Sequence, residues 1–300
     1  MHLDVLRVFD FQRHKHLLRL EPKMLPPASM KLLAFSFLAA KILSAQIQVL
    51  GIATSSDFSP ILPSPGSLAS VFVSGLTGIS GIVQASGYPL PYNLGGISVT
   101  VYGTPAPILA VADVGGSYQQ INIQVPFSSD INTLIQVTQS GQVGTFAPPG
   151  NSGLWGVFFA NATRQGVLQH ADYSLVTAAN PAKPGEVLVA YATDLAAYNA
   201  ISNAPPIGMP ANATPLPAID NPGVWELQVY VNSQLTTSQY TGLTPSLAGV
   251  FQVNFVVPAL TGAGTASLQI IDFPSCFGFS DLCPEVKKSN SVTFPVGSAN

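Results

Sequence analysis

The residues that could carry out catalysis are few and far apart in the sequence. His170 is the only histidine after His16, and it lies in the run Gln169-His170-Ala171-Asp172. It is therefore the one candidate for the base of a Ser–His–Asp arrangement, which needs a histidine held by a carboxylate. No Gly-x-Ser-x-Gly nucleophile elbow occurs in the chain. We interpret His170 as an ordinary loop or strand-end residue and predict no catalytic residue.

Paired carboxylates, metals and cofactors are equally poorly supported. Cleavage of a glycoside needs two carboxylates held at a fixed separation, and nothing in the sequence pairs the candidates. No calcium loop of the Asp-x-Asp-x-Asp-Gly type and no phosphate-binding loop is present. We predict no metal site and no cofactor. The carboxylates considered are Asp113, Asp130, Asp194, Glu186 and Glu226.

Two cysteines, Cys276 and Cys283, are the only ones in the chain. An even number of cysteines in an exported chain favours a disulfide, so we predict a bridge that closes the loop 276–283; free thiols and a metal site are the alternatives. Phe277 and Phe279 lie inside this loop. A closed tip that presents two aromatic rings is a candidate contact surface.

Other aromatic residues could form a platform on which sugars stack. Several fall near predicted loops or linkers, whereas Trp225 heads an alternating strand and is expected in the core. We expect most of these side chains to pack in the interior and the rest to be exposed singly, which explains the set better than a carbohydrate-binding site does. The residues are Tyr88, Tyr92, Tyr118, Trp155, Phe158 and Tyr198.

The charge content restricts the class of partner. Only 8% of the 300 residues are charged, with 11 basic against 14 acidic side chains. This balance argues against a phosphate-binding surface, and we therefore predict no nucleic acid as a partner. Natural sheets often protect their edge strands with lysine. A chain so poor in lysine is open to strand addition by a partner or to self-association.

The start of the chain has the pattern of a signal peptide. Met30-Lys31 is followed by the apolar run 32–40 and then by Ser44-Ala45 before Gln46. The run is far shorter than the ~20 residues that a membrane-spanning helix needs. We predict a signal peptide over 30–45 and no membrane span in the mature chain. Residues 1–29 are then a mis-assigned or disordered extension, and the product is secreted or held at the cell surface.

The elements that must position these residues are strands. Residues 97–102, 121–125, 225–231, 251–255 and 292–296 alternate between apolar and polar side chains, which is typical of half-buried strands. Several of these segments recur in the same order later in the chain. Residues 65–72 match 184–191, 99–102 match 227–230, and 120–126 match 252–258. The distance between matched segments grows along the chain, as loop insertions in the second copy would produce.

We therefore predict an all-β chain with two tandem immunoglobulin-like β-sandwiches, over 46–146 and 154–300, joined by a linker at 147–153. An up-and-down barrel is the alternative architecture.

The same segments resemble an uncharacterised C-terminal domain family of exported acidobacterial proteins. The resemblance rests on 65–76, 90–101, 120–126, 180–185, 252–258 and 289–294, and extends over roughly 55–297. It implies export and a tandem immunoglobulin-like or IPT/TIG-like architecture, and it implies no catalytic residues. The chain departs from the family at Asp194, where a Thr-Gly-Leu-Gly run is usual, at the insertion 114–118, and in the cysteine loop.

These observations favour a non-enzymatic, exported structural or adhesive module. Its expected partner is a protein or a polysaccharide outside the cytoplasm, and self-association is compatible with its low content of charged residues. A carbohydrate-binding accessory protein is the second hypothesis, and a secreted hydrolase built on His170 is the third.

Overall fold

The structure, a computed structural model, describes residues 46–113, 115–127, 134–148, 157–195, 204–211, 225–274 and 287–298. All regular secondary structure in these segments is β-strand, arranged in four antiparallel sheets. The predicted extension 1–29, the signal peptide 30–45 and the cysteine loop 276–283 lie outside the described residues. Among the residues described, none belongs to a helix with the length and apolar character needed to cross a membrane.

The first half of the chain forms a sandwich of two sheets. One has the strand order β1-β2-β7-β6-β3 and the other β5-β4-β8-β9. The strands are β1 (Gln48–Thr54), β2 (Leu68–Ser74), β3 (Gly81–Gln84), β4 (Ile97–Val101), β5 (Thr104–Ala106), β6 (Ile108–Asp113), β7 (Gln119–Gln124), β8 (Ile135–Gln139) and β9 (Gln142–Phe146).

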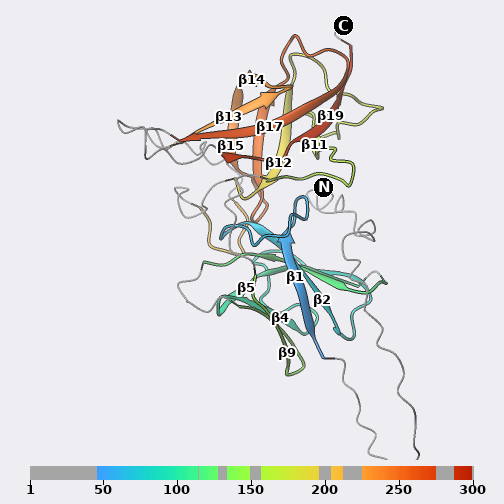
Figure 1. The fold of residues 1–300 in the computed structure, drawn as a ribbon, viewed down its shortest axis with the longest axis vertical. Coiled ribbons are helices and arrows are strands. Elements are labelled where there is room, and N and C mark those ends of the chain that lie inside the picture. Colours follow the sequence, from blue (N-terminus) through green and yellow to red (C-terminus); the bar gives the residue numbers. More distant parts are fainter. Residues whose placement is uncertain are drawn as a thin grey trace, which may run out of the picture.

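The second half forms another sandwich at the opposite end of the molecule (Figure 1). Its sheets have the orders β10-β12-β16-β15, with β11 also on β12, and β14-β13-β17-β18, with β19 also on β17. The strands are β10 (Val157–Phe158), β11 (Leu168–Gln169), β12 (Val187–Thr193), β13 (Trp225–Val231), β14 (Gln234–Thr236), β15 (Ser238–Leu243), β16 (Phe251–Val256), β17 (Gly264–Pro274), β18 (Lys287–Lys288) and β19 (Val292–Val296).

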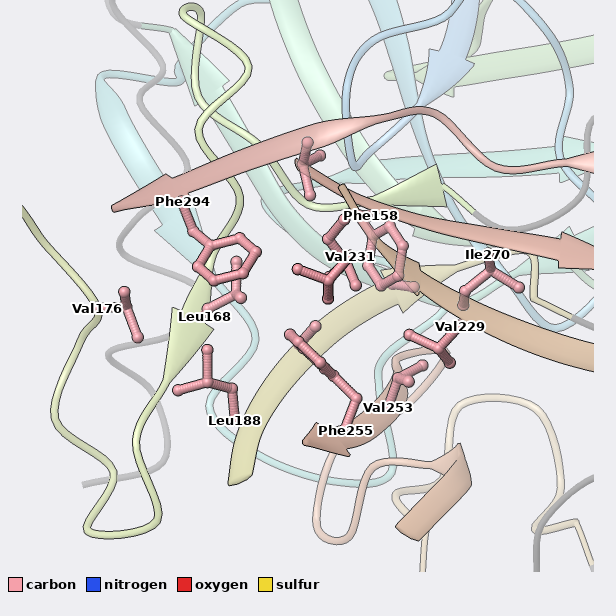
Figure 2. Close-up of a cluster of buried hydrophobic side chains, with 14 of the residues drawn as sticks. Phe158, Leu168, Val176, Leu188, Val229, Val231, Val253, Phe255, Ile270 and Phe294 are labelled. Carbon is pink, nitrogen blue, oxygen red and sulfur yellow. The ribbon is translucent and has the colours of Figure 1, made fainter. Parts of the chain in front are cut away.

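Each sandwich has its own hydrophobic core, built from the inward positions of alternating strands. In the first, Val71, Ile121 and Val137 come from both sheets and are fully buried. In the second, Phe255 and Phe294 meet nearly edge to face, with ring centroids 6.1 Å apart. Figure 2 shows these rings among Leu188, Val229 and the other residues of this cluster. The prediction of an all-β chain with tandem immunoglobulin-like sandwiches is confirmed, and the barrel alternative is wrong.

The two sandwiches repeat one pairing scheme. Leu68 of β2 pairs with Gln124 of β7, and Val187 of β12 pairs with Val256 of β16. The sequence match had already placed Leu68 with Val187 and Gln124 with Val256. Because a slip of one residue would move every side chain to the other face, both copies place the same positions in their cores.

One part of the sequence match is displaced. Val101 pairs with Thr104 across a two-residue turn, and Val231 pairs with Gln234 across another. Val101 therefore corresponds to Val231 in the structure, whereas the sequence match aligned it with Val229. Moving a strand by two positions keeps each side chain on its face, so the alternating pattern could not detect this displacement.

Candidate functional site

His170 makes two contacts that hold a loop. Its Nδ1 lies 3.1 Å from Oε2 of Glu186, and its Nε2 lies 3.2 Å from the carbonyl oxygen of Asn180. The other carboxylate oxygen of Glu186 accepts a hydrogen bond from the backbone N–H of Lys183 at 2.6 Å. A general base needs a free ring nitrogen that faces the nucleophile. Both nitrogens of His170 instead face groups of its own loop.

Asp172 and Ser174 lie close by in the chain but do not complete a triad. The hydroxyl of Ser174 donates to Oδ1 of Asp172 at 2.6 Å, and the backbone N–H of Ser174 donates to the same oxygen at 2.9 Å. These bonds hold the pKa of Asp172 below its usual range, and the nearby His170 adds to this effect. The carboxylate thus closes a turn, whereas in a triad it would orient the histidine.

The remaining predicted carboxylates each have a separate role. Asp113 accepts hydrogen bonds from the backbone N–H of Gly115 at 3.2 Å and from Nε2 of Gln119 at 2.9 Å. Asp194 is buried between the two sandwiches. Asp130 lies outside the described residues, and for Glu226 only the backbone is described. In the described part of the chain, no three His, Cys, Asp or Glu side chains gather in a way that could hold a metal ion.

The aromatic residues considered for sugar stacking have different environments. Phe158 is buried in the core of the second sandwich. The ring of Tyr118 packs edge-on against that of Phe72, with ring centroids 5.5 Å apart. Tyr92 is 52% exposed. The hydroxyl of Tyr88 accepts a hydrogen bond from the backbone N–H of Ala248 in the other sandwich at 3.1 Å. Trp155, Tyr198, Phe277 and Phe279, together with Cys276 and Cys283, lie outside the described residues.

Buried polar and apolar groups gather where the two sandwiches meet, a region that we call the junction. A third hydrophobic cluster spans it, separate from both cores. The first sandwich contributes Leu68, Leu90 and Leu109, and the second contributes Phe159, Val189, Tyr191, Leu247, Ala248 and Val250. Val189 and Tyr191 alternate along β12 with Leu188 and Ala190, which face the core. Both faces of this strand are therefore buried.

Polar groups of the junction are paired across it. Oγ1 of Thr193 accepts a hydrogen bond from the backbone N–H of Leu68 at 2.9 Å. Oδ1 of Asp194 accepts one from the N–H of Ser64 at 2.9 Å, and the N–H of Asp194 donates to Oγ of Ser67 at 3.1 Å. Asp194 has a φ of 57°, in the left-handed region that favours glycine. The carboxylate provides a contact across the junction that glycine could not make.

Gln124 and Gly208 form a second group of bonds across the junction. Gln124 is fully buried; its Nε2 donates to the carbonyl of Gly66 at 2.8 Å, and its Oε1 accepts from the N–H of Gly208 at 2.7 Å. The carbonyl of Gly208 accepts from the N–H of Leu90 at 2.8 Å. Both backbone groups of Gly208 are thus bonded to the first sandwich. Its φ of 84° and the 3.2 Å left between an added Cβ and Pro107 require glycine there.

Close backbone approach adds a steric constraint. A Cβ on Gly249 would lie 2.7 Å from Cδ2 of Leu68 and 2.9 Å from the carbonyl oxygen of Gly66. A larger residue at 249 would push the two sandwiches apart. Gly66 and Leu68 belong to the repeated Pro-Gly segment of the first copy, so this segment is one of the parts of the first sandwich that dock on the second.

Burial in the junction changes the pKa of two tyrosines. Burial raises the pKa of Tyr191 to about 12, and the nearby Tyr173 adds to this. The hydroxyl of Tyr191 donates to Oε1 of Gln169 at 2.6 Å. Burial also raises the pKa of Tyr88, against the opposing effect of the N–H of Ala248.

The sequence reasoning missed the junction, although one signal was present. Gln124 and Val256 occupy the same position of the repeat, at the end of the matched segments 120–126 and 252–258. An amide in one copy and a valine in the other, at a strand end, marks a position where the two copies have different surroundings. Gly208 carried no comparable signal.

Comparisons with known proteins add little. No family model and no curated protein matches the chain. Among solved structures it is similar to the I9-I11 tandem from titin, with 9% identity and a TM-score of 0.20 over 84% of this chain and 66% of that one. It is also similar to the endo-fucoidan hydrolase MfFcnA4 of glycoside hydrolase family 107, with 13% identity and a TM-score of 0.19 over 79% of this chain and 28% of that one. Likenesses this weak carry no argument about function.

We predict that Gln124→Val uncouples the sandwiches. The substitution leaves the N–H of Gly208 without its acceptor, at a cost of about 1–3 kcal/mol. Urea unfolding should change from one transition toward two, and the Gly208 amide should exchange faster with solvent. Gln136→Val on β8, away from the junction, is the control and should keep the wild-type profile. Equal profiles for both variants would contradict the role given to Gln124.

We predict that the chain loses stability between about pH 10 and about pH 12. The pKa of an unfolded tyrosine is about 10, whereas that of Tyr191 in the folded chain is about 12. The stabilisation is complete below the unfolded pKa and disappears as the pH rises through the folded one. Urea unfolding across this range should show a shallower decline for Tyr191→Phe than for the wild type. Identical slopes would refute the assignment.

Proposed function

We propose that the chain is an exported, non-enzymatic structural or adhesive module whose two sandwiches act as one stiff body. The observation that carries this proposal is the junction, where a shared hydrophobic cluster and the bonds of Gln124 and Asp194 join the halves. Domains of one chain usually move relative to each other unless their interface is large and hydrophobic. A fixed angle between the halves suits a protein that transmits or holds a contact.

The proposal that the chain is not an enzyme is supported by the structural roles of its imidazole and carboxylate groups. His170 and Glu186 hold a loop, Asp172 closes a turn and Asp194 joins the sandwiches. Each carboxylate or imidazole considered for catalysis and described in atomic detail thus has a role in the fold. Substrate turnover would need one of these groups to be released from its present partner.

The proposed place of action is outside the cytoplasm. The segment 30–45 has the charge and hydropathy pattern of a signal peptide, and the low charge content of the chain fits an extracellular contact protein better than a binder of nucleic acid. The proposed partner is another protein or a second copy of the chain, whereas a polysaccharide partner belongs to the carbohydrate-binding alternative.

We predict that the exported product begins at Gln46. Expression in a bacterial host, followed by intact-mass and N-terminal peptide analysis of the secreted fraction, measures this directly. Peptides from 1–29 in that fraction, or retention of 30–45, would contradict the cleavage assignment.

We predict that the full chain turns over no ester or glycan substrate and binds no glycan on an array. The His170→Ala variant should behave as the wild type does in both assays, because the proposal gives His170 only a structural role. Turnover that disappears in His170→Ala would establish the hydrolase alternative. Glycan binding that weakens in Tyr92→Ala would establish the carbohydrate-binding alternative.

A further inference from the structure

Among the described strands, β3 forms one end of the five-stranded sheet of the first sandwich. It pairs with β6 on one side, with Ile82 opposite Ala112 and Gln84 opposite Ala110. Just beyond it, the N–H of Ala85 donates to the carbonyl of Leu109 at 2.9 Å. In an antiparallel pair, bonded and non-bonded residue pairs alternate. The backbone groups of Ile82 and Gln84 therefore point away from β6, toward the edge.

This edge lacks the usual protection against pairing with another chain. Native sheets protect an edge with lysine, proline, a bulge or a covering segment. No charged residue occurs anywhere from Phe58 to Ala112, and the register between β3 and β6 is regular. Ile82 is 45% exposed, and Gly81 and Gln84 are exposed as well, so the described part of the chain leaves this strand largely open to solvent.

Two other sheet edges are less open than β3. Strand β1 runs close to β9, where a Cβ on Gly144 would lie 2.7 Å from the carbonyl oxygen of Ile47. At the edge strand β15 of the second sandwich, the hydroxyl of Tyr240 donates to the carbonyl of Leu243 at 2.6 Å. Such contacts leave less room for an added strand than β3 does.

We propose that β3 is the site at which two copies of the chain associate, by antiparallel pairing of β3 with β3 about a two-fold axis at Val83. The proposal rests on the proposed contact function and names its partner as a second copy. With this register Ile82 lies opposite Gln84 of the second copy, and both residues direct their backbone groups at each other. The two-fold axis generates two Ile82–Gln84 pairs between the copies. Together these pairs form four backbone hydrogen bonds and join the two five-stranded sheets into one.

The chemistry of the edge selects this occupant. Self-pairing requires that the strand not repel itself, and like charges opposite each other destabilise a strand pair. The strand Gly-Ile-Val-Gln has no charge to repel a copy and none to attract a charged peptide. Since the paired segment is short, the dimer is weak and depends on concentration.

Sedimentation equilibrium of the full chain over a concentration series tests this proposal. The wild type should show a monomer–dimer equilibrium. In the variant Ile82→Lys/Gln84→Lys each introduced lysine faces another lysine, and the dimer dissociation constant should rise about tenfold or more. In Ile82→Lys/Gln84→Glu each lysine faces a glutamate, and dimerisation should return. Val143→Lys, at an exposed position of β9, is the control and should dimerise as the wild type does.

A wild type that stays monomeric at every concentration would overturn the proposal, as would equal dissociation constants for the two double variants. If the double-lysine variant fails to fold, the wild-type and lysine–glutamate results still decide. These outcomes are independent of export, turnover and glycan binding, so a failure here leaves the proposed function to be judged by its own tests.

Discussion

A buried polar group must find a partner, and this requirement governs how the two sandwiches are joined. The amide of Gln124 is completely removed from water and lies between a carbonyl of its own sandwich and an N–H of the other. An unpaired amide in such a place costs more free energy than a typical hydrogen bond contributes. The junction must therefore form with one geometry, because a small rotation of one sandwich would break these bonds.

The hydrophobic cluster and the polar bonds of the junction have different roles. Burial of the leucines, Tyr191 and their neighbours supplies a favourable but non-directional contribution. The bonds of Thr193, Asp194 and Gly208 supply direction. A side chain on Gly208 would meet Pro107, and one on Gly249 would meet Leu68. Because both residues are glycine, the apolar surfaces of the two sandwiches can meet in this arrangement. Hydrophobic burial and directional hydrogen bonds likewise act together in the interiors of single domains.

The fold followed from the sequence because alternation of apolar and polar residues is a strong local signal. It located β13 and β19 over their full length and predicted β4 to within one residue. The repeat also gave the register of β2 on β7 and of β12 on β16. It misplaced the 99–102 match by two residues, since alternation repeats every second position. The bond between Gln124 and Gly208 joins a matched segment to a residue outside every matched segment, so the repeat carried no signal for this pairing.

The site could be predicted less well than the fold for a related reason. Candidate residues were chosen by chemical type, which drew attention to His170 and the carboxylates. Of the candidates described in atomic detail, Asp194 belongs to the junction, whose other contacts use backbone groups, hydroxyls, an amide and apolar side chains. The position shared by Gln124 and Val256 shows where the two copies diverge. Comparison of a repeat with itself can therefore point to a docking surface, because a polar residue in one copy and an apolar residue in the other indicate different surroundings.

The rigidity of the junction can be measured directly with residual dipolar couplings of the full chain in a weakly aligning medium. If the sandwiches form one body, the amides of β1–β9 and of β10–β19 will report one alignment tensor with the same magnitude and orientation. Two tensors of different magnitude would mean that the halves move independently, and the account of a stiff tandem module would be wrong.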